Sequence, residues 1–280
     1  MRIQFSKYHA LGNDFVVAEA TRNRIPRGRL PEVVRSICDR HQGAGADGVI
    51  ILSASRSADG KFDIYNADGG WAEMSGNGLR IAGFHLARKN AGRRRLTLET
   101  SRGRAGVSLV KRIPGGAIIS GELGEPIFET SLIPVKVKPK YFINAPLKVG
   151  PVALPATCVS VGNPHAVLVV ENFDFDWKAL GAEIEHAGIF PNRTNVEFVR
   201  IMSRSRIRVR SWERGAGPTG SSGTGAAAAV SALVMQGLVK RSCEVQFDAG
   251  SLQVEWNDRT NIVSLTGPVH YIMSGEYQFI

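Results

Sequence analysis

The chain has 280 residues, of which 43% are hydrophobic and 21% charged, a balance that excludes a largely disordered protein. At this length two domains are the default expectation. The formal net charge of +10 raises nucleic-acid binding as a function. The basic residues are scattered, however, and no nucleic-acid motif accompanies them, so we predict no nucleic-acid partner.

Neither the apolar runs nor the cysteines indicate a membrane or secreted protein. No apolar run reaches the roughly 20 residues of a membrane-spanning helix, and the first residues lack the apolar core of a secretory signal. Cys38, Cys158 and Cys243 are odd in number and widely spaced, unlike a disulfide framework or a zinc motif. We therefore expect a cytoplasmic protein with buried, unreactive thiols, no metal and no membrane partner.

In chain order, short runs rich in β-branched and aromatic residues predict a series of strands separated by Gly, Asn and Asp turns. The predicted strands are 15–20, 48–54, 61–66, 95–101, 105–110, 116–123, 165–173, 195–202, 206–212, 243–250, 252–258 and 261–269. Basic residues alternate with apolar or small ones in 135–140 and 204–210, which predicts strands with one solvated face.

Two helices are predicted, one beginning after Met74 and the other after Ser222, with glycines near their ends at Gly92 and Gly237. The alanine-rich run after Ser222 is typical of a helix buried on most sides. One helix in each strand-rich half predicts an α+β fold with two pseudo-symmetric lobes. In each lobe we expect a curved, mostly antiparallel sheet wrapped round the central helix.

Two sequence features of the N-terminal half recur in the C-terminal half, separated by nearly the same number of residues. Each predicted helix begins at a serine that follows a polar residue by nine positions, and a Gly-Asn pair lies about sixty residues earlier. The paired positions are Asn66 with Glu213 and Ser75 with Ser222, at an offset of 147, and Asn13 with Asn163, at an offset of 150. Two matches at nearly one offset indicate a duplicated lobe.

The segments that begin at Ser75 and Ser222 are suited to binding an anion. The first N–H groups of a helix have no internal partner, and the helix dipole favours negative charge there. The adjacent glycines allow a carboxylate to approach the backbone. The alternative is that both serines are ordinary N-caps, but the duplicated context favours the anion site.

Six segments in order resemble the signature blocks of the diaminopimelate epimerase family: HALGNDFVV, CDRHQGAGADGVI, YNADGGWAEMSGNGLR, VSVGNPHAVLVV, NVEFV and WERGAGPTGSSGTGAAAA. The resemblance covers nearly the whole chain. It implies a pyridoxal-independent isomerase that converts LL- to meso-diaminopimelate without a cofactor, and a homodimer. We expect an N-terminal lobe of residues 1–118 and 267–280, a C-terminal lobe of residues 119–266, and an active site in the cleft between them.

By the same resemblance, the two cysteines that the family uses as acid and base correspond to Ser75 and Ser222. A serine hydroxyl does not ionise in the accessible pH range and normally needs an adjacent base. His165, Glu213 and Glu73 are candidates for that base. The departure puts the two-base epimerisation in doubt, rather than the fold or the pocket.

The resemblance also implies a set of residues that bind an amino-acid substrate. Asparagines and an acid–arginine pair would hold its far end, and the helix starts would hold the reacting carboxylate. These residues are Asn13, Asn66, Asn163, Asn195, Glu213 and Arg214 for the far end, and Gly76, Asn77, Gly223 and Thr224 for the carboxylate.

Two other functions stay open beside the epimerase. One is a related enzyme of the superfamily, either another amino-acid racemase or a hydroxyproline-type dehydratase. For the dehydratase the symmetry demand is relaxed, because loss of water needs a base on only one face of the substrate. A non-catalytic homologue could also retain the pocket, because serine still hydrogen-bonds a carboxylate.

Overall fold

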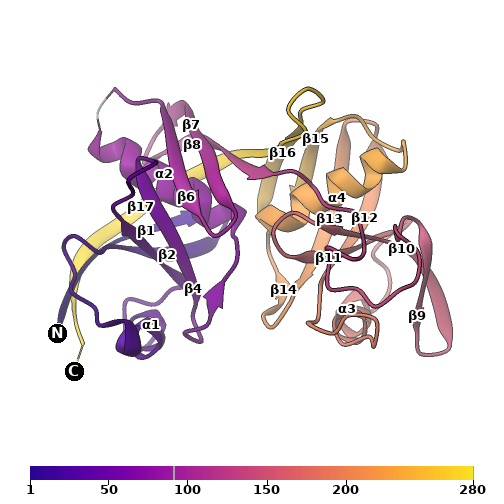
Figure 1. Cartoon of the computed structure of the whole chain (residues 1–280), viewed down its shortest axis with the longest axis horizontal. Helices are drawn as coiled ribbons and strands as arrows, with labels where there is room; N and C mark the ends of the chain where they lie inside the picture. The colour runs from indigo at the N-terminus through magenta and orange to yellow at the C-terminus, as the bar shows by residue number, and fades with distance from the viewer. Residues whose placement is uncertain (91, 280) are drawn as a thin grey trace. The chain divides into compact units, whose positions relative to one another are not determined.

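The computed structural model of the chain describes residues 1–90 and 92–279 (Figure 1). It divides into two compact units, an N unit of Met1–Glu122 with Thr266–Ile280 and a C unit of Leu123–Leu265. Two strands, β8 (Gly116–Gly124) and β17 (Val263–Gln278), run from one unit into the other. The boundaries expected after residues 118 and 266 fall inside these two strands.

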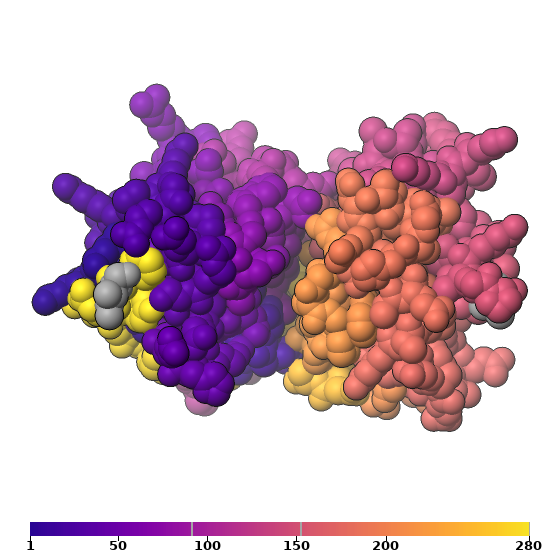
Figure 2. Space-filling view, turned by 90° about the horizontal axis from the view of Figure 1, so that it is seen from below, coloured from indigo at the N-terminus to yellow at the C-terminus, as the bar shows by residue number. Residues whose placement is uncertain are grey.

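The N unit contains most of β8 and β17 together with a short 3-10 helix, two α-helices and seven further strands. Their bounds are β1 Arg2–Ala10, β2 Asn13–Glu19, η1 Arg27–Arg29, α1 Leu30–Cys38, β3 Gly48–Ser53, β4 Gly60–Asn66, β5 Trp71–Ala72, α2 Gly76–Lys89, β6 Arg95–Thr100 and β7 Gly103–Ile113. The main-chain N-terminus donates to the carbonyl of Phe279 at 2.5 Å, and β1 pairs with β17. Figure 2 accordingly shows the last residues of the chain against the first ones.

The C unit contains two α-helices and eight strands besides the ends of β8 and β17. Their bounds are β9 Ala145–Val149, β10 Val152–Ser160, β11 Pro164–Val169, α3 Trp177–Glu185, β12 Asn195–Ser203, β13 Arg206–Glu213, β14 Gly217–Thr219, α4 Gly223–Met235, β15 Ser242–Phe247 and β16 Gly250–Trp256.

The same strand-pairing scheme occurs in both units. In the N unit β1–β2, β3–β4, β4–β5 and β6–β7 are antiparallel, whereas β2–β3 and β4–β6 are parallel. In the C unit β10–β11, β12–β13, β13–β14 and β15–β16 are antiparallel, whereas β11–β12 and β13–β15 are parallel. The predicted α+β fold and the predicted duplication are both confirmed at the level of strand pairing.

In each unit the strands curve round one helix, as the sequence predicts. Helix α2 packs against β1, β2, β3, β4, β6 and β7, and α4 packs against β10, β11, β12, β13, β15 and β16 (Figure 1). All eleven residues that follow Ser222 are buried, and Ala226 to Val230 are all 0% exposed. Small side chains allow this burial because the strands can approach the helix backbone closely.

Several sequence predictions were incomplete. Helices α1 and α3 and strands β1, β9 and β10 were not predicted, and β17 continues nine residues beyond the predicted end at residue 269. The segment 135–140 is not a strand, although its basic and apolar residues alternate. Pro134 precedes the segment and Pro139 lies within it, and both lack the amide hydrogen that a ladder needs. Among the helices of the described residues, none has the length and apolar character to cross a membrane.

Candidate functional site

Ser75 and Ser222 are the N-caps of the two central helices. The Ser75 hydroxyl accepts a hydrogen bond from the Gly78 N–H at 3.0 Å, and the Ser222 hydroxyl accepts one from the Gly225 N–H at 3.1 Å. Ser222 is only 3% exposed, whereas Ser75 is half-buried. The predicted helix starts are confirmed, and the N-cap function of the serines is part of the structure whatever else they do.

The residues after the two serines form the first turn of each helix. Gly76 and Asn77 begin α2, Gly223 and Thr224 begin α4, and all four are buried. The N–H groups of a first turn have no carbonyl partner within the helix. N–H groups of this kind can bind a carboxylate. The carboxylate-binding role of these four residues stays a prediction.

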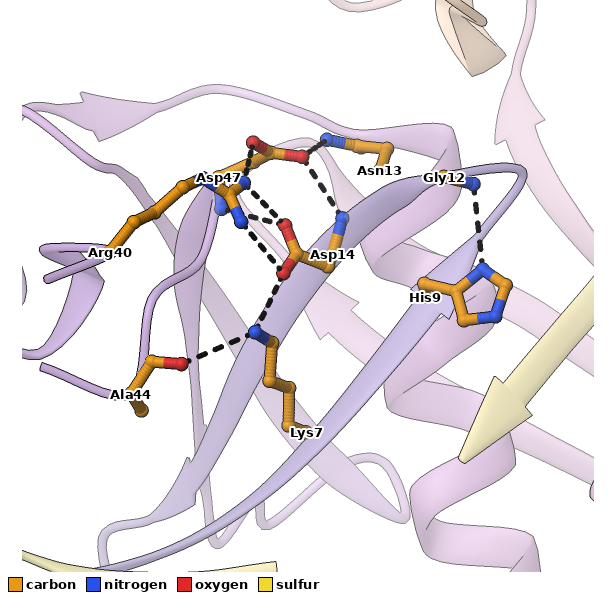
Figure 3. A network of polar contacts seen from close by, with 8 residues as sticks. All are labelled: Lys7, His9, Gly12, Asn13, Asp14, Arg40, Ala44 and Asp47. Carbon is orange, nitrogen blue, oxygen red and sulfur yellow. Dashed lines mark hydrogen bonds and ion pairs between the residues drawn. The ribbon is translucent and has the colours of Figure 1, made fainter. Parts of the chain in front are cut away.

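In the N unit, a network of charged side chains surrounds Asn13 at the start of β2 (Figure 3). The Asn13 amide donates to Asp47 Oδ2 at 2.9 Å, and the main-chain N–H of Asp14 donates to the same oxygen at 3.0 Å. Arg40 contacts Asp14 at 2.9 Å and Asp47 at 2.7 Å, and Lys7 contacts Asp14 at 2.8 Å. The position of Asn13 is therefore fixed by a carboxylate that is itself held by an arginine.

Asp14 is the buried carboxylate of this network. Burial alone would raise its pKa, but hydrogen bonds and charge from Arg40 and Lys7 outweigh burial and lower the pKa below its usual value. Asp14 thus stays ionised and keeps both basic side chains beside Asn13. Asn66, the other asparagine expected to bind substrate in this unit, lies exposed at the end of β4, where its main-chain N–H donates to Gly70.

In the C unit, Asn163 belongs to a buried chain of polar side chains. His165 Nε2 lies 2.8 Å from Asn163 Oδ1, and His165 Nδ1 lies 2.9 Å from Glu197 Oε1. The side chains of His165 and Glu197 are both 0% exposed. The amide of Asn163 also donates to the Thr224 hydroxyl at 3.4 Å, so this chain reaches the first turn of α4.

Glu197 lies directly against the start of α4. A Cβ atom at Gly225 would be 2.7 Å from Glu197 Oε1, closer than real contacts allow. Only glycine at this position lets the carboxylate occupy its place beneath the helix. A buried carboxylate at a helix N-terminus is stabilised by the dipole of the helix.

Glu213 is hydrogen-bonded to Ser222 itself. Its carboxylate accepts from the Ser222 hydroxyl and, at 3.2 Å, from the Thr219 hydroxyl. Burial raises the pKa of Glu213 more than these two bonds lower it, and the nearby charge of Glu197 raises it further. A carboxylate of raised pKa in contact with a hydroxyl is the arrangement of a base next to the group that it assists.

Asn195 and Arg214 lie next to each other, but their contacts are largely with the main chain. The Asn195 amide donates to the Pro164 carbonyl at 2.8 Å and accepts from the Arg214 N–H at 3.0 Å. The guanidinium of Arg214 donates to the Asn192 carbonyl at 3.3 Å. Asn195 thus holds the turn that follows Glu213, and its contacts with the described residues use one amide hydrogen and one lone pair of the carbonyl oxygen.

Four polar residues near the helix starts were not singled out from the sequence: Arg40, Asp47, Arg80 and Glu197. Glu197 and Arg80 each carried a signal, because each is a charged residue inside an apolar run, VEFV and LRIAGF. Arg40 and Asp47 lie in turn-like segments where charge is ordinary, so pattern alone could not separate them from the surface. Within residues 1–90 and 92–279, no three His, Cys, Asp or Glu side chains are grouped to hold a metal ion.

The three cysteines are free and buried, as predicted. Burial raises the pKa of Cys38 and of Cys158 to about 12 and that of Cys243 to about 11. None of these thiols is activated as a nucleophile or base near neutral pH.

Comparison with known proteins places the chain in a family. The family model described as diaminopimelate epimerase matches residues 5–121 and 157–272. A protein named diaminopimelate epimerase from Caldanaerobacter subterraneus subsp. tengcongensis is 40% identical over 281 residues, covering 99% of this chain and 100% of the relative. A protein of the same name from Pelotomaculum thermopropionicum is 37% identical, covering 99% of both chains.

Solved structures agree in fold at much lower identity. A hydroxyproline epimerase from Agrobacterium vitis has a TM-score of 0.73 at 16% identity, covering 98% of this chain and 90% of that one. A probable proline racemase from Agrobacterium radiobacter has a TM-score of 0.73 at 17% identity, covering 99% and 93%. These two likenesses concern the fold alone. The family match and the full-length relatives show that this chain belongs to the diaminopimelate epimerase family.

Proposed function

We propose that this protein binds diaminopimelate and interconverts its LL and meso forms at one α-carbon. The observation that carries the proposal is the end-to-end match to relatives of that name at 36–40% identity. The two buried helix starts support it, because each has the unpaired N–H donors that a substrate carboxylate needs.

We further propose that residues of both units act on one substrate. Ser75 and Ser222 would face opposite sides of its α-carbon, with the reacting carboxylate held by Gly76, Asn77, Gly223 and Thr224. The far end would be held by Asn13, Asn66, Asn163, Asn195, Glu213 and Arg214. We also infer a homodimer in the cytoplasm, an assembly that sedimentation of the full chain would test.

Proton transfer in this proposal begins at Ser222. The Ser222 oxygen takes the α-proton while its own hydroxyl proton passes to the carboxylate of Glu213, so that no free alkoxide forms. The electron pair left on the α-carbon spreads onto the substrate carboxylate, where the helix N–H groups stabilise the added charge. Reprotonation from the opposite side uses the Ser75 hydroxyl. Ser75 then recovers a proton from solvent while Glu213 releases the proton it received to solvent, which returns the site to its starting state.

The test follows α-proton loss from LL-diaminopimelate in deuterated water by NMR, with stereochemical analysis of the product. We expect slow exchange in the natural protein and at least about 100-fold faster exchange in Ser75→Cys/Ser222→Cys, because a thiol ionises near pH ~8.5 and a hydroxyl does not. Ser231→Cys is the matched control, since Ser231 is a fully buried serine of α4 away from its N-terminus. An absence of exchange in both the natural and the double-cysteine protein would overturn the proposal.

One observation favours a second candidate, a binding protein without turnover. Both serine hydroxyls already cap their helices, and capping is a complete structural function. Calorimetry separates the candidates: diaminopimelate binding with no deuterium incorporation at high protein concentration supports the second. Turnover of hydroxyproline or histidine without diaminopimelate binding would instead indicate another reaction of the superfamily.

A further inference from the structure

Arg80 is a charged residue in the core of the N unit, in the second turn of α2. It is 0% exposed, and its guanidinium donates only to neutral oxygens among its described hydrogen bonds. Nε donates to the Gly76 carbonyl at 3.3 Å, Nη1 to the Pro268 carbonyl at 3.4 Å, and Nη2 to Asn77 Oδ1. Burying a positive charge without a carboxylate is costly, which calls for a reason to keep it there.

The hydrogen bonds continue from Arg80 in one direction. Asn77 Nδ2 donates to Asn13 Oδ1 at 3.2 Å, and Asn13 Nδ2 donates to Asp47 Oδ2 at 2.9 Å. An asparagine amide can normally be turned either way. Here the chain begins at a guanidinium, which can only donate, and ends at a carboxylate, which can only accept. Both amides are therefore held in one orientation.

We propose that Arg80 is a positioning residue that fixes the amide orientation of Asn77 and Asn13, and so sets which donors and acceptors they present to the ligand. The inference rests on the proposed function in that the ligand is the amino-acid substrate. In the described contacts each amide uses one Nδ2 hydrogen and one lone pair, which leaves one of each for the ligand at the start of α2 and at the start of β2.

The positive charge of Arg80 also affects anion binding at the start of α2. Burial lowers its pKa to about 9, which still leaves the guanidinium protonated at neutral pH. Its Nε bonds to the carbonyl of Gly76, the first residue of the helix. A positive charge one turn below the helix start adds to the dipole and favours a carboxylate there.

The C unit offers an internal contrast. The residue five positions after Ser222 is Ala227, where the residue five positions after Ser75 is Arg80. Asn163, the counterpart of Asn13, contacts His165 rather than an asparagine fixed by arginine. The relay from Arg80 to Asp47 is therefore confined to one of the two duplicated units.

The first test needs no ligand. Side-chain amide signals of Asn13 and Asn77 are recorded by ¹⁵N NMR on the full chain, assigned with the matching Asn→Ala variants. In Arg80→Gln the chain begins at a group that can donate or accept, so we expect both signals to shift and broaden, whereas Arg80→Lys keeps them sharp. Arg88→Gln is the control in the same helix, because Arg88 stacks over Tyr271 at 3.9 Å and contacts the Tyr8 hydroxyl.

The second test measures diaminopimelate affinity by calorimetry. We expect at least about 10-fold weaker binding for Arg80→Gln and a change within about threefold for Arg80→Lys and Arg88→Gln. Unchanged amide signals in a folded Arg80→Gln protein would overturn the inference. If Arg80→Gln does not fold, Asp47→Asn serves instead, since it makes the other end of the relay ambiguous. A natural protein that binds no diaminopimelate contradicts the proposed function, while the NMR result still decides the role of Arg80.

Discussion

The helices that begin at Ser75 and Ser222 are surrounded by strands with the same pairing scheme, but the side chains at equivalent strand positions differ. In the N unit, Phe15 of β2 pairs with Gly48 of the parallel strand β3. In the C unit, His165 of β11 pairs with Asn195 of the parallel strand β12, in the same place of the same pairing scheme. The duplicated fold thus has an aromatic hydrocarbon at this register position in one unit and a hydrogen-bonding ring in the other.

At the next equivalent strand position on the same face, the N unit again has an apolar residue where the C unit has a polar one. Val17 pairs with Ile50 in the N unit, and Val167 pairs with Glu197 in the C unit. Ile50 and Glu197 are both 0% exposed. The strand ladder does not depend on which side chain occupies these positions, because ladders use main-chain groups. A few core substitutions are therefore enough to change the chemistry below a helix without changing the fold.

The charged side chains in contact with the first residues of the two helices or with their N-cap serines have opposite sign. The N unit has the buried cation Arg80, and the C unit has the carboxylates of Glu197 and Glu213. A cation favours holding an anion, whereas a carboxylate of raised pKa favours accepting a proton. We infer that the N unit mainly binds and the C unit mainly moves protons.

The largest effect on stability is expected when a buried polar residue of the C unit, His165, is replaced by an apolar one. His165→Leu leaves the buried Glu197 carboxylate without the ring at 2.9 Å, and should lower the free energy of unfolding by about 3–5 kcal/mol. Urea denaturation followed by circular dichroism measures the loss.

A double variant that also replaces Glu197 tests whether the unpaired carboxylate causes the loss of stability. In His165→Leu/Glu197→Ile the C unit carries an apolar pair like Phe15 and Ile50, so the double change should cost much less than His165→Leu alone. A double variant that is less stable than the single one would show that the buried pair is needed for the fold of the C unit rather than for its chemistry.

The second prediction separates activity from stability at Glu213. Glu213→Gln keeps a hydrogen-bond acceptor for Ser222 and Thr219 but removes the base, so α-proton exchange should fall by about 100-fold or more. Adding Asn66→Asp to this variant places a carboxylate at the counterpart position in the N unit, and it should not restore the exchange. Exchange that survives in Glu213→Gln would exclude Glu213 as the base.

The raised pKa of Glu213 also fixes how the stability of this variant depends on pH. Because the folded-state pKa lies above the ordinary value of 4.5, the protonated form is favoured by folding, and this contribution is lost as pH rises through the folded pKa. The glutamine of Glu213→Gln does not ionise, so this variant keeps the same stability contribution at every pH. The variant should therefore match the natural protein below pH 4.5 and become the more stable of the two as pH rises toward neutrality, as unfolding measured at a series of pH values will show.

The sequence predicted the fold better than it predicted the contacts of the site. Spacing alone located both serine N-caps and the duplication, because those depend on local chain geometry and a repeated order of elements. It did not predict that Asn195 binds main-chain groups, or that Asn13 binds Asp47, because both contacts join residues at least 19 positions apart. Helices α1 and α3 were missed because each is only nine residues long and has no repeated counterpart motif.

The smallest effect is expected at the two glycines that follow the serines by three positions. Alanine is the better helix former by about 1 kcal/mol, so an alanine at either position gains stability unless its methyl group has no room. At Gly78 the added Cβ would lie 2.9 Å from the terminal methyl Cδ1 of Ile64, which can move. At Gly225 it would lie 2.7 Å from Glu197 Oε1 and 2.9 Å from Ser222 Oγ, both of which are held by hydrogen bonds.

Gly78→Ala should therefore change the free energy of unfolding by less than about 1 kcal/mol, whereas Gly225→Ala should lower it by about 2 kcal/mol, because the buried carboxylate must leave its partner. Thermal unfolding of the two variants side by side measures the difference. Glu197→Ala/Gly225→Ala tests the cause, since a shorter side chain at position 197 makes room for the methyl group. Equal losses at Gly78 and Gly225 would mean that the two helix starts are supported alike, and that the carboxylate below Ser222 does not set the C unit apart.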